Sequence, residues 1–129
     1  MIVHTILYVA DQNRSMEYYK YLLGMEPTLN VPGMTEFKLN KDHILGLMPE
    51  SGIKRLLGEK IPDPAKGNGI PRAELYLRVS RPEPYFDRAI KLNSPELSPM
   101  QERDWGDRAC YIMDPDGHII AFATLPPDL

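Results

Sequence analysis

Two stretches of this sequence repeat one pattern, and this apparent duplication constrains the fold more than any other feature. Residues 3–9 align with residues 73–79, and residues 43–48 align with residues 118–123. The recurrence of this pattern in both halves of the chain indicates two related modules, and each module is one supersecondary unit. Two related modules usually pack about a pseudo-twofold axis, so equivalent positions of the two copies can converge on one site. The sequence therefore predicts two copies of one small unit.

Each half of the sequence has the pattern of a strand, a helix and then three strands. Asp11 is a plausible N-cap for the first helix, and Gly24 is placed to end it. Asp114–Gly117, which reads Asp-Pro-Asp-Gly, predicts a tight turn between the last two strands. We therefore predict an α+β fold in which two βαβββ modules form a curved mixed sheet around a cleft. The expected strands are 2–9, 25–31, 36–39, 44–48, 73–79, 97–102, 107–113 and 118–124, with helices after Asp11 and over 83–92 and a short helix around 53–57.

The whole chain, 1–129, is expected to be a single domain, because its length suits one hydrophobic core. The first module covers about 1–49, a linker about 50–71, and the second module about 72–125. Together with Pro49, the linker contains four prolines and four glycines. It is too long for a plain connector in a compact domain. We therefore interpret it as a lid or a link between the modules.

The charge, the apolar segments and the cysteine content of the chain argue against nucleic-acid-binding, membrane and secreted proteins. The net charge of −3 and the pI near 5.6 give no electrostatic reason to bind nucleic acid or an anionic membrane. No segment approaches the ~20 apolar residues of a membrane span, and the first residues lack a signal-peptide pattern. The single cysteine, Cys110, is expected to be a small core residue rather than a nucleophile. We expect a soluble cytoplasmic protein.

Successive side chains of a strand point to opposite faces of the sheet, which predicts which residues line the site. The face predicted for the site carries both polar and aromatic side chains. Leu75 and Leu77 then belong to the face that carries the helices. The opposite face presents its side chains to the cleft, and it contains His4, Ile6, Tyr8, Glu74, Tyr76 and Arg78.

Several of these side chains are candidate ligand contacts. Arg78 and Tyr76 suit an anionic or aromatic small molecule, through charge-assisted hydrogen bonds and stacking. The alternative is that Arg78 only pairs with Glu74 across the sheet surface. Tyr8 and Trp105 are candidate aromatic walls, and the alternative for Trp105 is packing over one end of the sheet.

Motifs at both ends of the chain resemble one known family. The opening Val-His-Thr-Ile-Leu-Tyr-Val-Ala-Asp and the later Leu23-Gly24-Met25 are similar to the start of glyoxalase I, and Asp114–His118 is similar to its end. Trp105–Arg108 resembles a stretch of bleomycin-resistance-like proteins. Together these motifs resemble the vicinal oxygen chelate superfamily of glyoxalases, extradiol dioxygenases, fosfomycin-modifying enzymes and antibiotic-sequestering proteins. The resemblance implies paired βαβββ modules around a cleft, and commonly a homodimer.

The resemblance also implies where a divalent metal would bind. The glyoxalase I pattern His, Glu, His, Glu falls here on His4, Gly46, Glu74 and Ala121. Only His4 and Glu74 could ligate through a side chain, whereas a catalytic site normally has about three protein ligands. We expect Glu36 and Glu102 to lie on the opposite face. Because only two side chains could act as ligands, we expect a protein without a bound divalent metal rather than one with such a metal.

We predict a glyoxalase- or bleomycin-resistance-like protein that binds a small organic molecule in its sheet-lined cleft, as a homodimer. The alternative is a divalent-metal-dependent lyase, isomerase or dioxygenase that uses His4 and Glu74. These two residues are also a candidate proton-transfer pair, because a carboxylate beside an imidazole orients it. The other interpretation is that His4 only provides a hydrogen bond to a carboxylate in a ligand pocket and takes no part in catalysis. Whether the protein is an enzyme stays open at this point.

Overall fold

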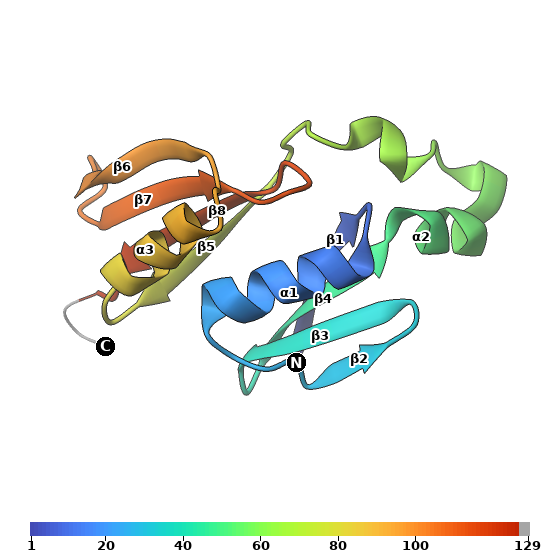
Figure 1. The fold of residues 1–129 in the computed structure, drawn as a ribbon, viewed down its shortest axis with the longest axis horizontal. Coiled ribbons are helices and arrows are strands. Elements are labelled where there is room, and N and C mark those ends of the chain that lie inside the picture. Colours follow the sequence, from blue (N-terminus) through green and yellow to red (C-terminus); the bar gives the residue numbers. More distant parts are fainter. Residues whose placement is uncertain (127–129) are drawn as a thin grey trace. The chain divides into compact units, whose positions relative to one another are not determined.

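The structure is a computed structural model that describes residues 1–126 (Figure 1). The chain divides into two compact units, Met1–Asn68 and a second unit that begins at Gly69. Each unit contains one four-stranded sheet with both parallel and antiparallel strand pairs. In each unit the elements of the sheet follow the order β-α-β-β-β. The predicted α+β fold of two βαβββ modules is therefore confirmed.

The first unit is a mixed sheet with one long helix on one face (Figure 1). Its strands lie in the order β1-β4-β3-β2, so β1 and β2 are the edge strands. β1 runs parallel to β4, and the other neighbours are antiparallel. The elements are β1 (Val3–Val9), α1 (Gln12–Leu23), β2 (Leu29–Val31), β3 (Met34–Asn40), β4 (His43–Pro49) and α2 (Glu50–Leu57).

Helix α1 begins and ends where its capping residues predict. The Asp11 side chain accepts a hydrogen bond from the Arg14 backbone N–H at 2.9 Å, which satisfies one of the free donors of the first turn. Gly24 ends the helix with φ = 66°, a left-handed conformation that glycine adopts at little cost. The apolar side of α1 packs on one face of the sheet. Together they bury Met16, Tyr19, Leu22, Phe37, Leu45 and Leu47.

The second unit repeats this arrangement, with α3 packed on one face of its sheet (Figure 1). Its strands lie in the order β5-β8-β7-β6, so β5 and β6 are the edges. The ring of Tyr85 stacks on that of Phe122, with centroids 4.8 Å apart. The elements are β5 (Glu74–Val79), α3 (Glu83–Lys91), β6 (Glu96–Glu102), β7 (Arg108–Met113) and β8 (Ile119–Thr124).

The predicted turn between β7 and β8 is present. One carboxylate oxygen of Asp114 accepts hydrogen bonds from the backbone N–H groups of Asp116 and His118, at 2.9 and 2.8 Å. Gly117 has φ = +89°, and the Gly69 N–H donates to the Asp116 carbonyl at 2.9 Å. The turn is therefore held by its own buried carboxylate and covered by the first residue of the second unit.

Two elements begin three or more residues away from their expected starting points. β2 covers only Leu29–Val31 rather than 25–31, because Met25 still bonds the Lys20 carbonyl and Pro27 has no N–H to pair. Helix α2 starts at Glu50, directly after Pro49, rather than near residue 53. It is followed by two short 3₁₀ helices, over Gly58–Lys60 and Pro64–Gly67. Among residues 1–126, no helix has the length and apolar character needed to span a membrane.

Candidate functional site

The predicted division of the strands into two faces is present in both sheets. In β1, His4 and Tyr8 lie on the face opposite α1, whereas Val9 is fully buried. In β5, Tyr76 and Arg78 lie on the face opposite α3, whereas Leu75 is buried. We call the first of these surfaces the His4 face, made of His4, Ile6, Tyr8, Met34, Glu36, Lys38, Ile44, Gly46 and Met48. The second is the Tyr76 face, made of Glu74, Tyr76, Arg78, Ala109, Tyr111, Ala121 and Ala123.

Two side chains of the Tyr76 face, Tyr76 and Arg78, form a connected network with Trp105 and Asp107 from the loop before β7, and we call these four residues the Tyr76 cluster. The Tyr76 hydroxyl donates to Asp107 Oδ2 at 2.6 Å and accepts from Trp105 Nε1 at 2.9 Å. Arg78 Nη2 lies 3.0 Å from the same carboxylate oxygen. Arg78 also lies over the Tyr76 ring, with Cζ 5.8 Å from the ring centroid. Three of the predicted ligand contacts are thus brought together around one carboxylate.

The electrostatics of the Tyr76 cluster keep its phenol neutral and its carboxylate paired. Burial raises the pKa of Tyr76, and the hydrogen bond to the Asp107 carboxylate raises this pKa further. Asp107 is only 8% exposed, and the Arg78 guanidinium balances its charge. Trp105 remains 57% exposed and the Arg78 side chain 38% exposed. The cluster therefore presents an aromatic surface and unused guanidinium N–H groups to solvent.

Asp107 is the member of the cluster that the sequence analysis missed. Arg78 pairs with Asp107 rather than with Glu74, the partner considered from the sequence. Asp107 lies just before β7, and its distance in the chain from β5 concealed the contact. The available signal was the Trp105–Arg108 motif, which places a carboxylate two residues after the tryptophan.

A second pair of polar side chains lies on the His4 face. His4 Nδ1 is 3.5 Å from Glu36 Oε2. The expectation that Glu36 lies on the opposite face is wrong. Glu36 pairs with Gly46 in the antiparallel register of β3 and β4, and directly paired residues share a face. The register of this hairpin, rather than the composition of β3, places Glu36 beside His4.

Gly46 permits the close packing around this pair. Gly46 lies between Ile6 on β1 and Glu36 on β3. A β-carbon at position 46 would be 3.1 Å from Ile6 Cγ1 and 3.3 Å from Met34 Sδ. Neighbouring side chains therefore already fill the space that a side chain at position 46 would need.

The residues do not fit the four-ligand metal site that the resemblance implies. Position 46 is crowded and has no side chain, and Ala121 is fully buried and cannot ligate. Within the part of the chain that the structure describes, no group of three or more His, Cys, Asp or Glu side chains could hold a metal ion. His4 and Glu74 belong to different units, so their pairing stays a prediction.

Two other chemically reactive side chains serve the packing. Cys110 is fully buried, and burial raises the pKa of its thiol, as expected of a core residue. The Nε2 atom of His43 lies 2.7 Å from the Thr5 hydroxyl, on the face that packs against α1. Cys110 is therefore enclosed in the core of its unit, whereas His43 is half-buried on the helix-bearing face of its sheet.

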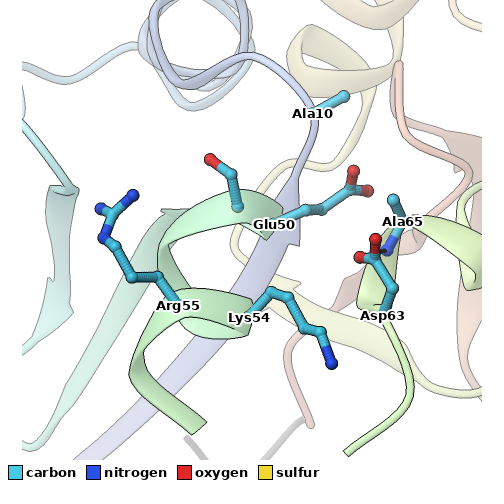
Figure 2. A pocket seen from close by; sticks show the side chains of 7 residues that line it. Ala10, Glu50, Lys54, Arg55, Asp63 and Ala65 are labelled. Atoms are coloured by element: carbon cyan, nitrogen blue, oxygen red, sulfur yellow. Dashed lines mark hydrogen bonds between the residues drawn. The ribbon is translucent and has the colours of Figure 1, made fainter. Parts of the chain in front are cut away.

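A cavity of about 390 Å³ lies in the first unit beside α2, and Figure 2 shows its charged lining. The Lys54 ammonium donates to the carbonyls of Gly58 and Ile61, both at 2.8 Å. The Asn68 amide donates to Glu50 at 2.8 Å. These charged groups thus tie α2 to the segment that follows it. None of the residues predicted for the site lines this cavity, whose walls are Ala10, Glu50, Ser51, Lys54, Arg55, Asp63 and Ala65.

Comparison with known proteins relates the sequence and the fold to one family. The model of the Glyoxalase/Bleomycin resistance protein/Dioxygenase superfamily matches residues 1–122. No curated protein matches the chain.

Solved structures share the fold at low sequence identity. A glyoxalase-related enzyme from Fulvimarina pelagi has a TM-score of 0.80 at 21% identity, covering 98% of this chain and 88% of that one. A glyoxalase/bleomycin resistance protein/dioxygenase from Nocardioides has a TM-score of 0.76 at 21% identity, covering 98% and 84%. Lactoylglutathione lyase from Agrobacterium tumefaciens has a TM-score of 0.71 at 20% identity, covering 96% and 92%. At these identities the likeness shows the fold alone.

Proposed function

Because the chain belongs to the Glyoxalase/Bleomycin resistance protein/Dioxygenase superfamily, we propose that it binds a small organic molecule against its sheets. The observation that carries this proposal is the Tyr76 cluster. It orders an arginine, a tyrosine and a tryptophan around one buried carboxylate, on a sheet face that no helix of its own unit covers. Such a preformed group of aromatic and polar side chains is typical of small-molecule sites.

The ligand that suits the cluster is an aromatic anion. Asp107 engages one end of the Arg78 guanidinium, which still has N–H donors for a carboxylate. The exposed indole of Trp105 offers a flat surface for stacking, while its N–H is held by Tyr76. Asp107 therefore positions both Tyr76 and Arg78 before a ligand arrives, which lowers the entropy cost of binding.

We further propose that the protein is a cytoplasmic homodimer. In each unit the first strand, β1 or β5, is a sheet edge. An edge strand carries unpaired N–H and C=O groups, which favour association with another chain. The buried, reduced Cys110 suits a reducing compartment. Light scattering during size-exclusion chromatography checks this part of the proposal, and a monomeric mass at micromolar concentration would contradict the dimer.

Thermal unfolding with benzoate tests the binding proposal. A ligand at about a hundred times its Kd adds roughly 2.7 kcal/mol of stability, which raises the Tm measurably. Benzoate should raise the Tm more than benzyl alcohol does, because only benzoate offers a carboxylate to Arg78. Arg78→Gln should weaken benzoate binding roughly 10-fold, by loss of a charge-assisted hydrogen bond. Arg81→Gln is the matched control, since Arg81 is exposed and lies outside the cluster.

Two outcomes would overturn the proposal. In the first, benzoate and related aromatic anions leave the Tm of the wild-type protein unchanged. In the second, Arg78→Gln and Arg81→Gln weaken binding equally, which would indicate a nonspecific effect of charge. Metal analysis of untagged protein distinguishes the proposed binding function from the alternative, a metal-dependent lyase, isomerase or dioxygenase. That alternative requires stoichiometric divalent metal that is lost in both His4→Ala and Glu74→Ala.

A further inference from the structure

We propose that Arg103 is a positioning residue for the Tyr76 cluster, because it fixes the loop that carries Trp105 and Asp107. This loop covers residues 103–107 and joins β6 to β7. The inference rests on the proposed function, since the side chains that Arg103 positions are those offered to the ligand. Every contact that supports it lies within the second unit.

The backbone of Arg103 is bonded to the far end of the loop. Its N–H donates to the Asp107 carbonyl at 2.7 Å, and its carbonyl accepts from the Gly106 N–H at 3.0 Å. Gly106 has φ = +95°, a conformation that glycine adopts without a steric penalty. Trp105 lies between the residues that make these bonds. The position of Arg103 therefore determines the position of the whole loop.

The side chain of Arg103 anchors the loop to both strands that it joins. On β6, Nη1 donates to the Ser98 hydroxyl at 2.8 Å, and Nη2 donates to the Pro99 carbonyl at 2.7 Å. On β7, Nε and Nη2 donate to the Ala109 carbonyl at 3.2 and 2.8 Å. The guanidinium also lies over the Tyr111 ring, with Cζ 5.1 Å from the ring centroid. All three guanidinium nitrogens are used, in a planar fork that a lysine ammonium cannot reproduce.

The sequence of β6 explains why this anchor is needed. Pro99 has no N–H group to donate to the neighbouring strand. The register between β6 and β7 shifts between Ser98 and Gln101, so the strands do not pair regularly there. Arg103 therefore bridges the two strands where their own pairing is interrupted.

Arg103 acts on the Tyr76 cluster through two residues of the loop. Trp105 Nε1 donates to the Tyr76 hydroxyl at 2.9 Å. Asp107 accepts from the same hydroxyl and pairs with Arg78. A displaced loop would move the indole of Trp105 and the carboxylate of Asp107 together. Arg103 therefore sets the spacing between the aromatic surface and the guanidinium that would hold the ring and the carboxylate of an aromatic anion.

The indole N–H signal of Trp105, measured by ¹H–¹⁵N nuclear magnetic resonance, tests the positioning without any ligand. The chain has one tryptophan, so the signal is unambiguous. Tyr76→Phe removes the acceptor of this N–H and provides the chemical shift of a released indole. Arg103→Gln should move the signal toward that value. Arg103→Lys should move it in the same direction, because lysine keeps the charge and loses the fork.

Arg88→Gln is the matched control. Arg88 also packs on a tyrosine of the second unit, with Cζ 4.6 Å from the Tyr85 ring centroid, but it belongs to α3 rather than to the loop. This variant should leave the Trp105 signal unchanged. The methyl signals of Ile112 and Ile120, which are both fully buried, report whether the second unit is folded in each variant. If Arg103→Gln does not fold, Arg103→Lys decides the test.

Benzoate affinity connects the positioning to the proposed function. Arg103→Gln should weaken benzoate binding about 2- to 10-fold, because a loop without its anchor has to be ordered when the ligand binds. Arg103→Lys should also weaken binding although it keeps the positive charge, which separates positioning from simple charge attraction. Arg88→Gln should leave the affinity unchanged.

The inference fails on either of two results. One is a Trp105 signal that stays at its wild-type position in folded Arg103→Gln and Arg103→Lys. The other is full benzoate affinity in Arg103→Lys, which would show that only the charge of Arg103 matters. If benzoate does not bind even the wild-type protein, the proposed function fails, and the indole signal still decides whether Arg103 holds the loop.

Discussion

The hydroxyl of Tyr76 and the carboxylate of Asp107 lie 2.6 Å apart, the shortest of the hydrogen bonds that hold the Tyr76 cluster together. Burial raises the pKa of Tyr76, and the carboxylate raises it further by disfavouring the phenolate. Asp107→Asn should therefore lower the pKa of Tyr76 while burial keeps it above the ordinary value. Titration of the Tyr76 ring carbon by nuclear magnetic resonance measures this change. An unaltered pKa in Asp107→Asn would contradict it.

The same pKa shift predicts how stability depends on pH. The folded pKa of Tyr76 lies above the unfolded value near 10.0, so the neutral phenol is favoured in the folded state. The stability that this shift contributes is complete below the unfolded pKa. It is lost as pH rises through the folded pKa. Urea unfolding at about pH 8 and about pH 10.5 should show a smaller loss of stability in Tyr76→Phe than in the wild type. The same measurement on Tyr111→Phe provides a comparison, because burial also raises the pKa of Tyr111.

The thiol of Cys110 should be unreactive until the second unit unfolds. It is fully buried, and burial raises its pKa, so both access and thiolate fraction are low. A disulfide reagent at neutral pH should modify the native protein at least roughly 100-fold more slowly than the guanidinium-unfolded protein. Equal rates in the two states would show that β7 is not packed as described.

Gly46→Ala should destabilise the first unit. The new methyl group would lie 3.1 Å from Ile6 Cγ1 and 3.3 Å from Met34 Sδ, so both side chains would have to move away from it. We expect a loss of about 1 kcal/mol in the free energy of unfolding, at the lower end for an overpacked site. Gly52→Ala is the matched control in α2, because its nearest contacts are ordinary, at 3.8 and 3.9 Å. It should be neutral or stabilise α2 by up to about 1 kcal/mol. Urea unfolding measures both variants.

Gly117→Ala should be more destabilising than Gly106→Ala. Both glycines have positive φ, at +89° and +95°, so alanine is strained in either position. At Gly117 the methyl group would also lie 2.5 Å from the Gly69 Cα, whereas nothing lies within 4 Å at Gly106. The difference between the two variants therefore isolates the steric contact of the turn with the backbone of Gly69. We expect it to exceed about 1 kcal/mol by urea unfolding, and equal effects would contradict this contact.

Local signals in the sequence were sufficient to predict the elements of both units. Asp11 and Gly24 marked the ends of α1, and Asp114–Gly117 marked the last hairpin. These signals succeed because capping and turn geometry depend on a few neighbouring residues. The bounds of β2 were overestimated, because Met25 still belongs to the C-terminal cap of α1, where its N–H donates to the Lys20 carbonyl.

For the site residues too, local features were predicted correctly and contacts distant in the chain were not. The faces of Tyr76 and Arg78 were predicted from strand alternation, and the face of His4 from the alignment of the two modules. The partners of these residues were not, because Glu36 and Asp107 reach them across strand pairs that are distant in the chain. Pair register couples residues tens of positions apart, and one residue of slip would reverse every face.

By itself, the sequence determined that this chain folds into two βαβββ units and that His4, Tyr76 and Arg78 leave the helix-covered faces of their sheets. It could do so because hydrophobic period, capping and turn chemistry are short-range properties. Only the tertiary structure decided that Glu36 rather than another carboxylate lies beside His4, and that Asp107 joins Tyr76 to Arg78. Those contacts depend on strand register and on the packing around Gly46, which no local pattern contains.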